Sequence, residues 1–177
     1  MNSVVDYINR AYELAFESGW EQAWDRVVPW DRSTHILTVT RPVNAVKAAV
    51  KLRRYVKGRT VLEVGAGVGL LASELSKHTK LTVAVELDPL WAYGYYKYVY
   101  PTVLRDRRPL LFLVGDAFTL ERLNARFDIG LYVGLSQARE FLELLGKLSN
   151  RVIHLTPTTV FVGDKFHEDF KLEVKQG

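Results

Sequence analysis

The stretch from Val61 to Leu71 combines an apolar run, an acid and three closely spaced glycines. It reads VLEVGAGVGLL, with Glu63 two residues before Gly65 and further glycines at positions 67 and 69. Glycine permits a tight turn and lets the backbone approach a ligand with no Cβ in the way. A helix that begins directly after such a turn leaves its first N–H groups available to a ligand. The stretch therefore predicts a strand, a ligand-binding turn and a helix.

Two further carboxylates stand at the ends of the next two apolar runs. Glu86 closes the run LTVAVE, and Asp116 follows the run LLFLVG. A carboxylate at the tip of a strand can accept hydrogen bonds from both hydroxyls of a ribose, and one at the next tip can accept a bond from the exocyclic amine of adenine. Together with the glycine turn, these acids indicate a site for a ligand that contains adenosine.

Two classes of adenosine ligand bind turns of this kind. The dinucleotide fingerprint GxGxxG/A requires a small residue where this chain has the bulky Leu70. The turn signature for S-adenosylmethionine, (D/E)xGxGxG, is matched at every fixed position from Glu63 to Gly69. Glu86 fits both ligands equally well. The turn therefore favours S-adenosylmethionine, and a nicotinamide-dependent oxidoreductase is the less favoured alternative.

These three elements together resemble the class I S-adenosylmethionine-dependent methyltransferases, over roughly residues 58–135. The segments VLEVGAGVG, VAVELD and VGDA are especially similar to those of the ribosomal-RNA adenine dimethyltransferases. The resemblance implies a methyltransferase in which Glu63 lies near the methionine end of the cofactor, Glu86 takes the ribose and Asp116 takes the adenine. It implies that the remaining cofactor contacts come from Gly65, Ala66, Gly67, Gly69, Leu87 and Ala117.

The similarity to the adenine dimethyltransferases ends after the fourth expected strand. Those enzymes carry an Asn-Pro-Pro-Tyr-type motif there, which grips the amino group to be methylated, whereas this chain reads DIGLYVGLSQ from Asp128 to Gln137. Methylation of adenine N6 is therefore not expected. Tyr132 and Ser136 stand where acceptor contacts would fall, but Tyr132 fits a core strand position equally well.

No catalytic residue is assigned, because methyl transfer from a sulfonium to a nucleophilic acceptor needs mainly proximity and alignment. Two function classes stay open. The first is a self-sufficient methyltransferase of unknown acceptor. The second is a cofactor-binding or structural partner subunit with little or no catalysis of its own, since the region after the fourth strand is unfamiliar and the C-terminal part is short.

The elements that must position these residues alternate along the chain. Short apolar runs at 60–64, 81–86, 110–114, 129–133 and 151–155 read as strands, with helices expected at 69–78, 89–100, around 120–124 and at 137–148. This alternation predicts a Rossmann-like, doubly wound and mostly parallel sheet. A C-terminal antiparallel hairpin is expected from 158–162 and 170–174, with no helix between it and the fifth strand.

The chain of 177 residues fits one domain, with an N-terminal helical extension over residues 1–40 and the cofactor-binding core over 41–177. There is no cysteine, and the four histidines lack the spacing of a zinc pair, so no metal site is expected.

The sequence shows no signal peptide and no apolar run of the roughly 20 residues needed to cross a bilayer, so we expect a cytoplasmic protein. Met1 is the only methionine, a mild sign of a thermophile.

Two surface features indicate partners. The helix between Trp91 and Tyr100 carries aromatic residues on more than one face, which indicates either a dimer or protein contact or core packing with some exposed tyrosines. Basic residues precede the first and third strands, at Lys51, Arg53, Arg54, Lys57 and Arg59 and again at Arg105, Arg107 and Arg108. Because cofactors bind at the opposite, carboxyl edge of such sheets, we expect this basic surface to lie away from the cofactor. It either solvates the fold or docks RNA.

Overall fold

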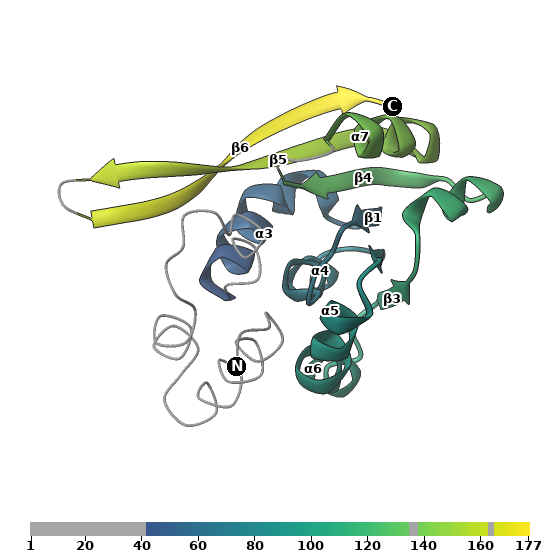
Figure 1. The fold of residues 1–177 in the computed structure, drawn as a ribbon, viewed down its shortest axis with the longest axis horizontal. Coiled ribbons are helices and arrows are strands. Elements are labelled where there is room, and N and C mark those ends of the chain that lie inside the picture. The colour runs from purple at the N-terminus through teal and green to yellow at the C-terminus, as the bar shows by residue number, and fades with distance from the viewer. Residues whose placement is uncertain (1–41, 135–137, 163–164) are drawn as a thin grey trace.

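The computed structural model describes residues 42–134, 138–162 and 165–177, and its side chains are described over most of these (Figure 1). The expected helical extension over residues 1–40 and the candidate acceptor residue Ser136 lie outside this part. The first described element is helix α3, Pro42–Val56, which ends two residues before Gly58.

A sheet in the order β3-β2-β1-β4-β5-β6 forms the centre of the molecule. Its first five strands are parallel, and β6 pairs antiparallel with β5. The order reverses between β1 and β4, as in a doubly wound sheet, so the expected fold class is confirmed. The bounds are β1 Thr60–Val64, β2 Leu81–Glu86, β3 Leu110–Val114, β4 Phe127–Val133, β5 Ser149–Val162 and β6 Lys165–Gln176.

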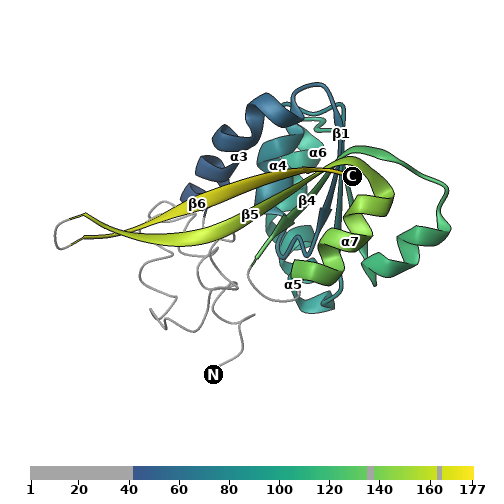
Figure 2. The same cartoon turned by 90° about the horizontal axis from the view of Figure 1, so that it is seen from above.

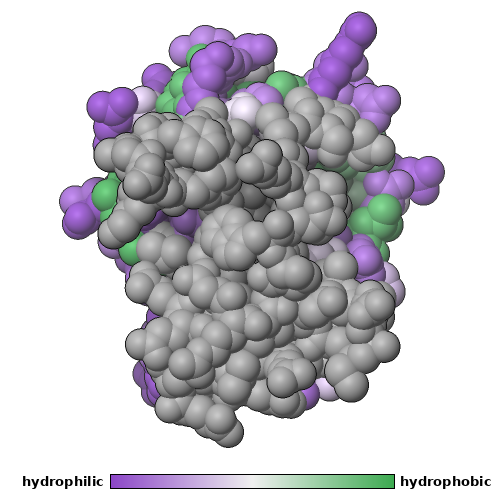
Figure 3. Space-filling view, turned by 60° about the vertical axis from the view of Figure 1, so that its left-hand side comes forward, coloured by the Kyte–Doolittle hydropathy of each residue, from purple (hydrophilic) through white to green (hydrophobic). Residues whose placement is uncertain are grey.

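Helices cover both faces of this sheet, which explains why its strands are apolar on both sides (Figure 2). Helix α3 and α4, Leu70–Ser76, lie on one face, and α7, Ala138–Leu148, lies on the other. On the α3 side the strands contribute Val61, Ile129, Leu131, Ile153 and Leu155 to the core. On the α7 side they contribute Leu62, Val64, Val83, Val85, Tyr132 and Val152. In Figure 3, most described side chains at the rim of the molecule are hydrophilic.

The segment after β2 forms one long helical stretch with a widened turn in its middle. It consists of α5 (Pro89–Gly94), the π-helical segment η2 (Tyr95–Val99) and α6 (Tyr100–Arg105). The helix therefore continues five residues beyond the predicted end at Tyr100. Pro101 explains the widened turn, because proline has no N–H to donate to the preceding turn and its ring crowds that turn.

Both C-terminal strands are longer than predicted, and β6 spans Lys165–Gln176 where the sequence indicated 170–174. The fifth strand and the first arm of the expected hairpin are a single strand, because β5 runs without interruption from Ser149 to Val162. It pairs with β6 from Arg151↔Gln176 to Val162↔Lys165, and the two extend as a ribbon beyond the rest of the sheet (Figure 1). The expected absence of a helix between the fifth strand and the hairpin holds over the described residues.

Candidate functional site

The three motifs that the sequence singled out meet at the carboxyl edge of the sheet. Val64 is in register with Val85, and Glu86 with Val114, so the ends of β1, β2 and β3 lie side by side. Two backbone hydrogen bonds extend this pairing into the turns: Gly65 N–H donates to Val85 O at 2.9 Å, and Gly115 N–H donates to Glu86 O at 2.8 Å. The parallel topology therefore gathers the glycine turn, Glu86 and Asp116 at one edge.

The glycine turn adopts a backbone that other residues rarely adopt. Gly65, Gly67 and Gly69 have φ of 72°, 57° and 71°, all in the left-handed region. Gly69 is restricted further, because a Cβ there would lie 2.7 Å from Tyr95 Cδ2 and 3.0 Å from Phe112 Cε2. Those two rings are stacked, with centroids 3.9 Å apart. The third glycine thus lets α4 begin against an aromatic pair.

Glu86 is held in place by the backbone on both sides of its carboxylate. Gly67 N–H donates to Oε2 at 2.7 Å, and Asp88 N–H donates to Oε1 at 2.9 Å. The first of these bonds joins the tip of β2 to the glycine turn after β1. Each carboxylate oxygen can accept a further bond, so Glu86 is oriented and still able to bind the two hydroxyls of a ribose.

Glu63 is the most unusual ionisable group among the described residues. Its side chain is 2% exposed, and its Oε2 atom has no hydrogen-bond partner. Burial, reinforced by the nearby Glu86 carboxylate, raises the pKa of Glu63 to about 8. A buried acceptor without a partner costs free energy, so a cationic or hydrogen-bonding group placed beside it would be favoured.

Asp116 has a structural role that the sequence did not indicate. Its Oδ1 accepts from Phe118 N–H at 2.9 Å and so caps the 3₁₀ helix η3, Ala117–Arg122. This cap explains why the helix begins at Ala117 and not near the expected Leu120. Asp116 is exposed and its second oxygen remains available, while Ala117 is buried behind it and Leu87 is exposed beside the tip of β2.

Aromatic residues line the same edge beyond β1. Tyr132 near the end of β4 is buried, and its ring lies 4.0 Å from the place of a Cβ on Gly65. It packs against Phe141 of α7, with centroids 5.1 Å apart, and stacks on His154 of β5 at 5.6 Å. His154 Nε2–H donates to Gly134 O at 2.8 Å and so ties β5 to the chain leaving β4. The sequence did not indicate His154, because its position is apparent only once β4 and β5 are paired.

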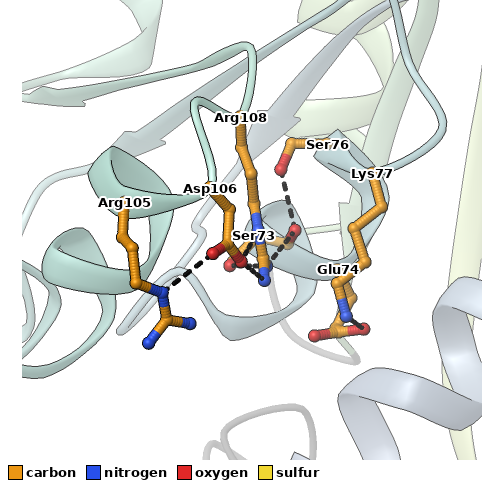
Figure 4. A network of polar contacts seen from close by, with 7 residues as sticks. All are labelled: Ser73, Glu74, Ser76, Lys77, Arg105, Asp106 and Arg108. Carbon is orange, nitrogen blue, oxygen red and sulfur yellow. Dashed lines mark hydrogen bonds and ion pairs between the residues drawn. The ribbon is translucent and has the colours of Figure 1, made fainter.

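The basic loop before β3 lies at the opposite edge, as predicted, but one of its arginines is structural. Arg108 donates from Nη1 to Ser73 O and Oγ at 3.1 and 2.8 Å and pairs through Nη2 with Asp106 at 2.6 Å (Figure 4). Its side chain is only 12% exposed. Arg108 is therefore engaged by α4 and Asp106 and is not a free surface charge. Arg107 is exposed.

The described residues offer neither a metal site nor a membrane-spanning helix. Within that part of the chain, no three histidine or acidic side chains come together as a metal site. None of the helices described has the length and apolar character needed to span a bilayer.

Comparison with known proteins finds relatives by structure alone. No protein-family model matches the chain, and no curated protein sequence matches it. The ribosomal protein L11 methylase of Lactobacillus delbrueckii subsp. bulgaricus is similar with a TM-score of 0.54 and 15% identity, over 76% of this chain and 78% of that one. TrmN of Thermus thermophilus has a TM-score of 0.53 and 23% identity over 75% of this chain and 48% of its own. MtNAS in complex with MTA and tNA has a TM-score of 0.54 and 17% identity, over 84% of this chain and 53% of its own.

The fold is similar to that of the ribosomal protein L11 methylase and of the other two structures, and at these identities the similarity concerns the fold alone. The chain spans about half the length of TrmN and of MtNAS. At these identities the comparisons establish the fold, and the closer similarity to the ribosomal-RNA adenine dimethyltransferases stays a prediction from the sequence.

Proposed function

We propose that this protein binds S-adenosylmethionine at the carboxyl edge of its sheet and transfers the methyl group to an acceptor. One observation carries the proposal: the left-handed glycine turn and Glu86 form a single unit through the Gly67 N–H bond. Asp116 stands at the end of the next strand. This arrangement fits an adenosine, and the methyltransferase fold of the neighbouring structures supports the assignment.

The electrostatics of the site fit the charge of this cofactor. S-adenosylmethionine carries a sulfonium and an α-ammonium group, and it supplies the methyl group when bound. Glu86 would hold the ribose hydroxyls, and Asp116 the adenine amine. Glu63 has an unpartnered oxygen, so a cation at the methionine end of the cofactor would satisfy it. Gly65, Ala66, Gly67 and Gly69 would shape the turn beneath the cofactor.

The chain's own contribution to methyl transfer is alignment. The ring of Tyr132 lies beside Gly65 of the turn and packs against Phe141 of α7, which would help to fix the cofactor side of the site. No side chain needs to move a proton if the acceptor is already nucleophilic, because holding the two reactants in line removes much of the barrier. The segment that follows Gly134 would then decide which acceptor enters.

The test is ligand binding followed by a measurement of turnover. S-adenosylhomocysteine should raise the melting temperature, because a ligand that binds only the native state stabilises it. NAD should not, and an equal or larger shift with NAD would refute the assignment. Labelled S-adenosylmethionine and a panel of acceptors then measure transfer. Binding without turnover on any acceptor would favour the alternative of a partner subunit.

Glu86→Ala provides the residue-level test. Two hydrogen bonds to a charged carboxylate are lost, each worth roughly 1.5–3 kcal/mol, so affinity for S-adenosylhomocysteine should fall at least about tenfold in calorimetry. Asp116→Ala should weaken binding less, since it removes one bond to the adenine. The exposed Glu140→Ala serves as the matched control. Unchanged binding by Glu86→Ala would remove Glu86 from the site.

A further inference from the structure

The long helical stretch after β2 exposes a line of large apolar side chains. Tyr93, Tyr96, Tyr100 and Leu104 are 51%, 48%, 38% and 63% exposed, and they follow one another at helical spacing. We refer to these four residues as the tyrosine stripe. Soluble proteins rarely leave such a row of aromatic rings in water without a binding partner.

Two rings of the stripe, those of Tyr96 and Tyr100, are held by contacts with their neighbours. Tyr96 O–H donates to Phe112 O of the edge strand at 3.3 Å, and its ring contacts Tyr100 edge to face at 5.7 Å. Lys97 Nζ lies 5.7 Å from the ring centre of Tyr93, so a cation accompanies the aromatic faces. Rings that are already ordered lose little conformational entropy when a ligand stacks on them.

The stripe connects the two edges of the sheet. The helical stretch leaves the tip of β2, where Glu86 lies, and ends at Arg105, before the loop that enters β3 at the amino edge. At about 1.5 Å per residue, the stretch from Pro89 to Arg105 is roughly 25 Å long. One face of this helix therefore leads from the cofactor edge to the basic edge.

Three loops form a continuous basic surface at that amino edge. Gly58 N–H donates to His78 O, Lys80 N–H to Arg59 O and Thr82 N–H to Pro109 O, at 2.8–2.9 Å, so the loops entering β1, β2 and β3 adjoin one another. We call their charged residues, with Glu74, Arg105 and Asp128, the amino-edge cluster. Its cations are Lys57, Arg59, Lys77, Lys80, Arg105, Arg107 and Arg108, and its carboxylates are Glu74, Asp106 and Asp128. The cluster has a net charge of +4, equal to that of the whole chain.

Two of the three carboxylates of the cluster are ion-paired within it, and the third, Asp128, lies within electrostatic range of Arg59 and Lys80. Asp106 pairs with Arg105 and Arg108, Glu74 pairs with Lys77, and Asp128 accepts from Thr60. Within the described residues, Lys57, Lys80 and Arg107 form no ion pair. Lys77, Arg107 and Arg108 also line a pocket of about 340 Å³. Arg107 has a left-handed φ of 50°, a costly conformation for a residue other than glycine.

We propose that the amino-edge cluster and the tyrosine stripe together bind single-stranded RNA. The free cations hold the phosphates, and the tyrosines stack the unpaired bases along the path toward the cofactor edge. A positive surface combined with an aromatic platform is what single-stranded nucleic acids require. That the strand is also the methyl acceptor rests on the proposed function, whereas RNA binding itself does not.

A second copy of the chain fits this surface less well. Two amino-edge clusters facing each other would bring like charges together, which opposes association. An acidic protein would satisfy the cations, but it has no need of a row of ordered tyrosine rings. RNA accounts for both features, and an acidic protein accounts for one.

The test is fluorescence anisotropy with a labelled, unstructured RNA of about 12 nucleotides, in about 50–200 mM potassium chloride. Arg107→Glu combined with Lys80→Glu should weaken binding about tenfold or more and reduce its salt dependence, because each lost phosphate contact removes about 0.7 from the slope for a single strand. Tyr93→Leu combined with Tyr100→Leu should weaken binding about tenfold and leave the slope unchanged, because stacking is lost while apolar surface remains. Arg139→Glu on α7 is the control for charge reversal.

Three results would overturn the proposal. They are no RNA binding by the parent protein at the lowest salt, equal binding of a duplex of the same length, and full competition by polyglutamate with no effect of the tyrosine changes. The last result would point to an acidic protein partner. Calorimetry with S-adenosylhomocysteine separates this inference from the proposed function, since none of these variants alters the cofactor site. Cofactor binding that persists without RNA binding defeats the inference alone.

Discussion

The buried carboxyl of Glu63 makes the stability of the ligand-free protein depend on pH in a direction opposite to that of most acids. Its pKa is raised from 4.5 to about 8 in the folded state, first by burial and then by Glu86. Between these values the unfolded chain loses the Glu63 proton and the folded chain keeps it, so stability falls as pH rises through the window and levels off above about 8. Each pKa unit corresponds to about 1.4 kcal/mol. At the upper end of the window, ionisation of Glu63 should therefore lower the free energy of unfolding by roughly 5 kcal/mol.

Glu63→Gln removes the titration and retains a neutral side chain of similar size. We expect the variant to match the parent near pH 4.5 and to become progressively more stable than the parent up to about pH 8, by a few kcal/mol. Urea denaturation at several pH values measures this difference, and Glu140→Gln, an exposed glutamate, is the control. A constant difference between parent and Glu63→Gln across the range would refute the raised pKa and the dry environment inferred for this residue.

Three further predictions follow from individual contacts. Gly69→Ala should destabilise the protein by about 2–4 kcal/mol in thermal unfolding, from left-handed strain and overlap with the stacked rings, whereas Gly146→Ala, in open space on α7, should be neutral or stabilising. Arg108→Ala should cost about 1–3 kcal/mol in denaturant titration because the buried Ser73 Oγ loses its donor and Asp106 loses one of its two ion pairs. Arg105→Ala, whose side chain is 73% exposed, should cost almost nothing. Binding of S-adenosylhomocysteine near pH 7 should release a proton from Glu63, detected by calorimetry in buffers of different ionisation enthalpy; equal heats in all buffers would count against a cation beside Glu63.

The sequence by itself predicted the order of strands and helices, the parallel sheet and the edge at which the three motifs meet. These features are encoded locally, because apolar periodicity and a glycine-rich turn depend on residues close together in the chain. The position of Asp116 at a strand end followed from the same pattern. The limits of β5 did not, because the sequence indicated two separate strands at 151–155 and 158–162, and pairing with β6 makes them one.

Only the tertiary structure decided what individual side chains do within that framework. Oε2 of Glu63 is left without a hydrogen-bond partner because β1 is covered on both faces, and Arg108 is engaged by Ser73, which lies 35 positions away in the sequence. The same packing turns Tyr95 onto Phe112 and leaves Tyr96 at the surface, although the two are neighbours in the chain. Burial and pairing depend on segments brought together from far apart. Local sequence therefore determined where the site lies, and the packing of distant segments determined its charge, its dryness and the surface that leads to it.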